Sequence, residues 1–112
     1  MKISAQTPKP ATIEVVRNAF ISGAEQMRRN LYRSSFSPVI YEMKDCSVGI
    51  YDSEGSLLGQ APGLPFFLGS LGGTIRAVIS QKSANIFKAD DIWIVNDSTI
   101  CGSHLNDITV FA

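Results

Sequence analysis

The apolar residues in the first third of the chain are spaced like one face of a helix. They recur at intervals of three and four, at Ile13, Val16, Phe20, Ala24, Met27 and Leu31. Pro10 or Thr12 can open this predicted helix. The helix is expected to end near Tyr32, because Pro38 cannot continue it. Residues 1–10, with two prolines among polar side chains, are predicted to form a flexible arm.

Residues 46–61 have the pattern of a β-hairpin. Val48 and Ile50 alternate with small or polar residues, which is typical of a half-buried strand. The stretch 52–55 then reads as a turn, with Gly55 at a position that tolerates positive φ. Two leucines begin the return strand, which completes the predicted hairpin.

The second half of the chain combines loop, helix and strand signals. Residues 61–73 are rich in proline and glycine and are predicted to form a loop, although their apolar content indicates packing or an interface. A helix is expected over residues 74–84, a buried strand over 92–95 and a further strand over 108–111. The predicted fold class is α+β: an N-terminal amphipathic helix, a β-hairpin, a second helix and further strands. Because nothing follows the last strand, we expect an incomplete part of a larger α/β fold.

Composition places limits on function and location. A chain of 112 residues with 45% hydrophobic residues indicates one globular domain, and ten basic against ten acidic side chains give no charge signal for nucleic acid or anionic membranes. The cysteines, Cys46 and Cys101, are too few for a disulfide framework, and no apolar run is long enough for a membrane span. These features predict a cytoplasmic protein without nucleic-acid or membrane partners.

The strongest candidate chemistry lies near the last strand. His104, the only histidine, precedes Asp107 by three residues in a loop leading into a strand. Imidazole and carboxylate suit Zn, Mn or Fe(II), but a catalytic site needs about three protein ligands. Asp97, at the end of the preceding strand, could be the third ligand or could orient the histidine. From spacing alone, a merely hydrogen-bonded loop histidine is the favoured reading. A Cys101–His104 nucleophile and base is a weaker one, because nothing in the spacing lowers the thiol pKa.

Several motifs, in order, resemble the hydantoinase B/5-oxoprolinase family. Residues 14–18 read EVVRN and residues 33–38 read RSSFSP. Residues 45–61 fit the hairpin pattern D-x-S-x-x-x-x-D-x-x-G-x-L-x-x-Q-A. Residues 90–112 are similar to the family segment G-D-x-x-x-x-N-D-P-Y-x-G-G-T-H-x-x-D. The resemblance covers residues 11–112, which are taken as the N-terminal segment of one such domain.

The resemblance implies an enzyme that hydrolyses a small cyclic amide, of the hydantoin or 5-oxoproline type, with ATP supplied through a hydantoinase A-like partner subunit. His104 and Asp107 correspond to a metal-binding pair, which in the family is joined by a later histidine. Asp97, Asn96 and Asp45 are then candidates for orienting those ligands. The chain would be an N-terminal fragment or split subunit that needs a downstream polypeptide or a homo- or hetero-oligomer, and it is expected to be inactive alone.

Departures from the family pattern keep other functions open. Cys101 stands where the family has a glycine, and Phe67 stands where relatives commonly have a histidine. The family's chains also run to several hundred residues. The alternatives are a non-catalytic assembly or regulatory module, a related ketone carboxylase subunit, or a metal-binding chain without an ATP-dependent partner.

Overall fold

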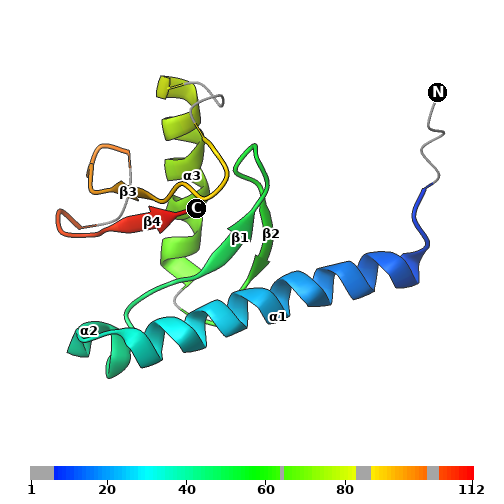
Figure 1. Ribbon diagram of the computed structural model, residues 1–112, viewed down its shortest axis with the longest axis horizontal. Coiled ribbons are helices and arrows are strands. Elements are labelled where there is room, and N and C mark those ends of the chain that lie inside the picture. The colour runs from blue at the N-terminus through cyan, green and yellow to red at the C-terminus, as the bar shows by residue number, and fades with distance from the viewer. Residues whose placement is uncertain (1–6, 64, 83–86, 101–103) are drawn as a thin grey trace.

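The structure begins with a long helix followed by a short one. The computed structural model describes residues 7–63, 65–82, 87–100 and 104–112. Helix α1 covers Pro10–Ser34, with Pro10 in the first turn, where its missing N–H is not needed (Figure 1). The amphipathic helix is thereby confirmed, ending slightly later than expected. Helix α2 covers Pro38–Tyr41, so Pro38 not only follows the first helix but also starts the next.

The predicted first hairpin is present and lies across α1. Strand β1 covers Gly49–Tyr51, strand β2 covers Leu57–Gln60, and the two are antiparallel (Figure 1). Gly55 adopts a φ of 78°, which only glycine adopts without strain. The backbone N–H of Ser56 donates to the Asp52 carboxylate at 2.8 Å, and this bond lowers the pKa of Asp52. Local hydrogen bonding therefore sets the turn.

A small hydrophobic core lies between α1 and this hairpin. Ala24, Val48 and Ala61 are buried together. Leu31 from α1 and Ile50 from β1 pack against them. The predicted stripe on α1 therefore contacts the hairpin through Ala24 and Leu31.

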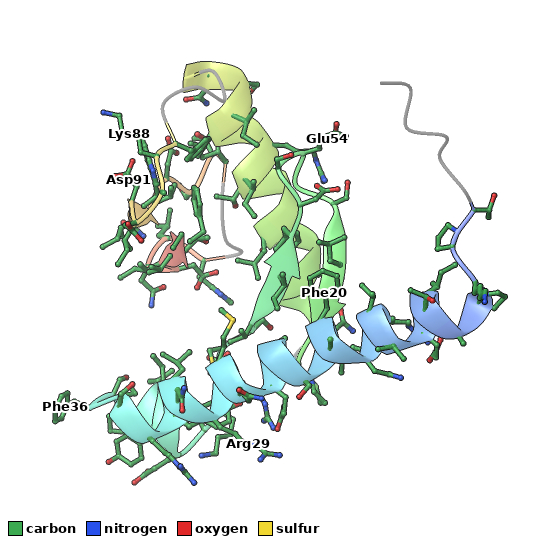
Figure 2. The ribbon with its side chains drawn as sticks, turned by 45° about the vertical axis from the view of Figure 1, so that its right-hand side comes forward. Phe20, Arg29, Phe36, Glu54, Lys88 and Asp91 are labelled. Carbon is green, nitrogen blue, oxygen red and sulfur yellow. The ribbon has the colours of Figure 1, made fainter. Side chains whose placement is uncertain are left out.

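Helix α1 and strand β2 approach so closely at Gly59 that a side chain has no room. A Cβ atom on Gly59 would lie 2.7 Å from the Phe20 Cβ and 3.0 Å from the Ile21 backbone nitrogen. Phe20 lies at the foot of the hairpin, facing this contact (Figure 2). Glycine at this position is therefore a packing requirement.

Helix α3 covers Pro65–Lys82 and stands beside the first hairpin (Figure 1). The predicted loop over residues 61–73 was therefore wrong for most of its length. One of the glycines that indicated a loop has a packing role instead: a Cβ on Gly72 would lie 2.9 Å from the carbonyl oxygen of Gly55. Arg76 donates to that same carbonyl from Nη1 at 2.8 Å. A glycine on this helix face allows α3 to pack against the hairpin turn.

The second hairpin joins strands β3 (Trp93–Val95) and β4 (Thr109–Phe111) in antiparallel register. Its inner face is packed, because the Phe87 ring centroid lies 5.2 Å from that of Trp93 and 6.0 Å from that of Phe111. Both predicted strands are confirmed. Lys88 and Asp91 mark the turn that leads into β3 (Figure 2).

The other face of the second hairpin is exposed, and this corrects the prediction of a buried strand over residues 92–95. Its side chains are between 58% and 70% exposed: Ile92, Ile94, Ile108 and Val110. Among the described residues this sheet has only two strands, and nothing buries that face.

The overall shape is elongated. The Cα radius of gyration is 15.9 Å, against about 13 Å for a compact domain of this length. The first turns of α1 project past the hairpin (Figure 1), and Val15 there is 68% exposed. In the part of the chain that is described, no helix has the length and apolarity needed to cross a bilayer.

Candidate metal centre

His104 and Asp107 lie on one tight turn between β3 and β4. The backbone N–H of Asp107 donates to the carbonyl of His104 at 3.2 Å, and the N–H of His104 donates to Asp107 Oδ2 at 3.1 Å. These two bonds bring the side chains together, with His104 Nδ1 3.7 Å from Asp107 Oδ1. The imidazole is 71% exposed and the carboxylate 22% exposed. The structure therefore places the predicted pair side by side on the surface.

Asn96 holds this turn against the end of β3. Its side-chain amide donates to the backbone carbonyls of Leu105 and Asp107. These hydrogen bonds join the end of β3 to the segment that leads into β4, and they fix the backbone that carries Asp107. Asn96 thus touches the predicted ligand segment, through backbone atoms of that segment.

Asp97 is engaged in a neighbouring turn. Its Oδ1 accepts the Thr99 hydroxyl at 2.6 Å and the Thr99 N–H at 2.9 Å, and these bonds, the hydroxyl first, lower the pKa of Asp97. The Asp97 carbonyl accepts the N–H of Ile100 at 3.0 Å. The carboxylate therefore shapes its own loop, and its assignment as a third ligand or orienting group stays a prediction.

Asp45 lies elsewhere in the fold, on the connection between α2 and β1. Its backbone N–H donates to the carbonyl of Val39 at 3.0 Å, and its side chain is exposed. Its predicted role beside the metal ligands stays a prediction. Cys101 lies outside the described residues, and so does the side chain of Phe67.

Sequence reasoning missed one residue that anchors the site. Thr74 on α3 is completely buried, and its hydroxyl lies 3.0 Å from the carbonyl of Ser70 and 3.2 Å from that of Ile100, so it can donate to either. The second contact ties the loop that follows Asp97 to α3. Its sequence signal is weak, because α3 contains other small polar residues, such as Ser70 and Ser80.

The turn fits part of a metal site. Zinc with nitrogen and oxygen ligands near 2.1 Å in tetrahedral geometry separates its donor atoms by about 3.4 Å. The 3.7 Å between His104 Nδ1 and Asp107 Oδ1 is close to that spacing. Among the described residues, however, no three His, Cys, Asp or Glu side chains gather in a way that could hold a metal. This turn therefore offers two donors, and a complete site requires others.

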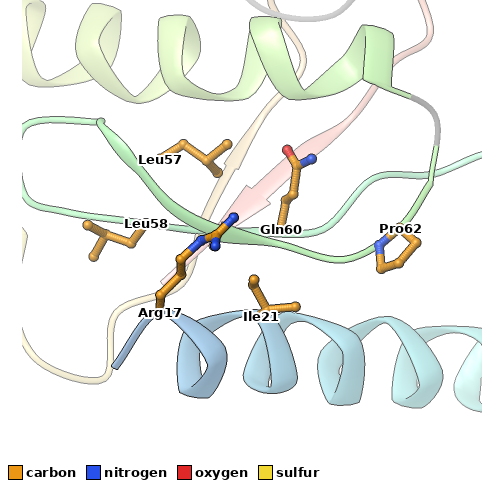
Figure 3. A pocket seen from close by; sticks show the side chains of 7 residues that line it. Arg17, Ile21, Leu57, Leu58, Gln60 and Pro62 are labelled. Atoms are coloured by element: carbon orange, nitrogen blue, oxygen red, sulfur yellow. The ribbon is translucent and has the colours of Figure 1, made fainter. Parts of the chain in front are cut away.

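A separate hollow lies between α1 and β2, with a volume of about 560 Å³ (Figure 3). Arg17 and Gln60 supply polar groups, and Ile21, Leu57 and Pro62 supply apolar ones. Arg17 is itself paired with Glu14 at 3.4 Å in an exposed contact. The predicted metal ligands do not line this hollow, so the hollow is separate from the His104 turn.

A comparison of this sequence with known protein families gives a match over nearly the whole chain. The sequence model of the hydantoinase B/oxoprolinase family matches residues 9–112. This chain belongs to that family. The resemblance seen in the ordered motifs is thereby confirmed.

Three relatives show how much of the family's length this hydantoinase B/oxoprolinase segment covers. An uncharacterized protein of Methanocaldococcus jannaschii is 37% identical over 101 residues, which is 88% of this chain and 18% of that protein. The 5-oxoprolinase 1 of Arabidopsis thaliana is 32% identical over 110 residues, covering 98% and 9%. Caprolactamase subunit beta of Pseudomonas jessenii is 30% identical over 105 residues, covering 94% and 18%. The chain spans less than a fifth of each relative, and no solved structure matches it.

Proposed function

We propose that this chain forms the N-terminal part of an enzyme that hydrolyses a small cyclic amide. The family match over residues 9–112, with the His104–Asp107 pair on one turn, carries the proposal. Two relatives are named for lactam substrates, 5-oxoproline and caprolactam, and both substrates are cyclic amides. The caprolactamase relative is named as one subunit, which supports a multi-subunit enzyme. An ATP-using, hydantoinase A-like subunit is the partner we propose, in the cytoplasm.

In this proposal His104 and Asp107 contribute two ligands to a divalent metal site. A cation there would polarise the amide carbonyl that is to be cleaved. The chain's own contribution is positioning. The Asp107 carboxylate accepts the His104 N–H and closes the turn, while Asn96 holds the backbone of the same turn to β3. Further ligands would come from polypeptide beyond this segment, so we expect the isolated chain to be inactive.

A chimera tests the proposal directly. The matched segment of caprolactamase subunit beta is replaced by this chain, the chimera is expressed with its partner subunit, and caprolactam hydrolysis is measured with and without ATP. Metal content is measured in the same preparation. We expect ATP-dependent hydrolysis and bound divalent metal.

Two variants in one turn separate the metal role from general damage. His104→Ala should lower the bound metal by about tenfold or more and abolish hydrolysis, because the site loses a ligand. Leu105→Ala, at a side chain that is 82% exposed in the same turn, should leave both unchanged. Full metal content and activity in His104→Ala would refute the site assignment.

One observation favours the alternative of a non-catalytic assembly module. The His104 side chain is largely exposed, and the described residues supply only two donors. In that case the chimera would assemble with its partner but would neither bind metal at this turn nor respond to His104→Ala.

A further inference from the structure

The exposed face of the second hairpin is apolar, although it is open to water. This outer face consists of Ile92, Ile94, Ile108 and Val110, which are 70%, 69%, 67% and 58% exposed. Ile94 and Val110 stand directly opposite each other in the register. An antiparallel hairpin with one solvated face normally carries polar residues there. Here both faces are apolar, which is typical of strands covered on both sides.

The second hairpin is also too small to be stable without further packing. It has two strands, and a two-stranded ribbon is marginal unless another strand or layer covers it. The inner face already meets Phe87 through the Trp93 and Phe111 rings. The outer face has no charged residue, so an occupant must offer an apolar surface.

We propose that the outer face binds an apolar surface in the remaining polypeptide of a hydantoinase B-type subunit. The inference rests on the proposed function. In the Methanocaldococcus jannaschii and Pseudomonas jessenii relatives the matched segment is 18% of the chain, so most of each polypeptide lies outside it and is available to cover this face. The His104 turn joins the two strands of this hairpin. Polypeptide that binds the outer face would therefore lie near His104 and Asp107. From there it would supply the further ligands that a complete metal site requires.

The test uses the full 112-residue chain and a complement, defined as the Methanocaldococcus jannaschii relative without its 101 matched residues. In a background with Cys46→Ala and Cys101→Ala, single cysteines are placed by Ile94→Cys and Val110→Cys. Lys88→Cys, at an exposed position before β3, is the matched control. Maleimide labelling rates are measured with and without the complement. The relative's own segment, added back, verifies that the complement is competent to bind.

We expect labelling at positions 94 and 110 to fall by about tenfold or more on binding, with position 88 unchanged, because an interface core excludes water. Binding with undiminished labelling at 94 and 110 would overturn the inference and leave the proposed function intact. No binding by this chain, where the relative's own segment binds, would also overturn it; the chimera's hydrolysis and metal content judge the proposed function separately. Protection in the free chain, with sedimentation as a dimer, would assign the face to a second copy instead.

Discussion

The two hairpins of this protein differ in how much of their packing lies within the described chain. The first lies on α1 and shares a core of Ala24, Val48 and Ala61 with it. The second packs one face through an aromatic cluster and exposes Ile94 and Val110 on the other. The predicted ligands are on the second hairpin. The hairpin that carries the candidate chemistry is therefore also the one whose apolar side chains are more exposed among the described residues.

The largest expected effect comes from separating α1 from the first hairpin. Gly59→Ala places a Cβ 2.7 Å from the Phe20 Cβ and 3.0 Å from the Ile21 nitrogen, and the backbone of a helix cannot move aside cheaply. We expect the free energy of unfolding to fall by about 3 kcal/mol, the upper part of the range for overpacking. Chemical denaturation of the purified chain measures it. An unchanged midpoint would mean that α1 and β2 are not in this close contact.

A smaller loss of stability is expected at the contact between α3 and the loop that follows β3. Thr74→Val keeps the shape of the side chain but removes the donor near the Ile100 carbonyl. A loss of about 1–2 kcal/mol is expected for a buried hydrogen bond. Hydrogen exchange should accelerate at the Ile100 amide, whose acceptor is the Asp97 carbonyl. Thr74→Ser keeps the hydroxyl and should preserve protection at that amide. Equal exchange in both variants would show that the bond does not anchor the loop.

Two glycines of α3 give opposite predictions from the same substitution. Gly69 has no atom within 4 Å of an added Cβ, so Gly69→Ala should stabilise the chain by about 0.5–1 kcal/mol through helix propensity. Gly72→Ala should destabilise it, because the Cβ would meet the Gly55 carbonyl oxygen at 2.9 Å. Thermal unfolding of the pair measures the difference. Stabilisation by both substitutions would show that α3 does not contact the hairpin turn there.

These glycines also explain which part of the fold sequence reasoning could not find. The long helix and the first hairpin were predictable from helical and alternating spacing, and strands β3 and β4 from their apolar, β-branched residues. The antiparallel pairing of β3 with β4 was not predicted. The start of α3 at Pro65 was not predicted either, because Gly69 and Gly72 are typical of loops when read locally. Only the three-dimensional contact between α3 and Gly55 shows that a helix can require glycine.

The candidate site was predictable only in part, for a similar reason. The H-x-x-D spacing made His104 and Asp107 candidates, and the structure places His104 Nδ1 3.7 Å from Asp107 Oδ1. Their assignment as metal ligands came from the family resemblance and stays a prediction. The spacing did not show that the Asp97 carboxylate accepts a hydrogen bond from Thr99, or that the Thr74 hydroxyl lies within hydrogen-bond distance of the Ile100 carbonyl. Both relations depend on loop geometry and on residues far apart in the chain.

The smallest expected effect is a pH dependence confined to α1. Glu25 accepts two bonds from Arg28, at 2.6 and 2.8 Å, and one from Arg29 at 3.1 Å. The Arg28 bonds, above all, lower the pKa of Glu25 from 4.5 to about 2. Since the folded pKa is depressed, the stabilisation is complete above pH 4.5 and is lost as the pH falls toward 2.

Glu25→Gln should therefore be less stable than the wild type near neutral pH and should converge with it toward pH 2. Glu14→Gln removes an exposed pair with Arg17 and is the control, expected to leave the denaturation profile unchanged. Parallel wild-type and Glu25→Gln curves across this pH range would show that the Glu25–Arg28 pair adds nothing to the stability of the first half of the molecule.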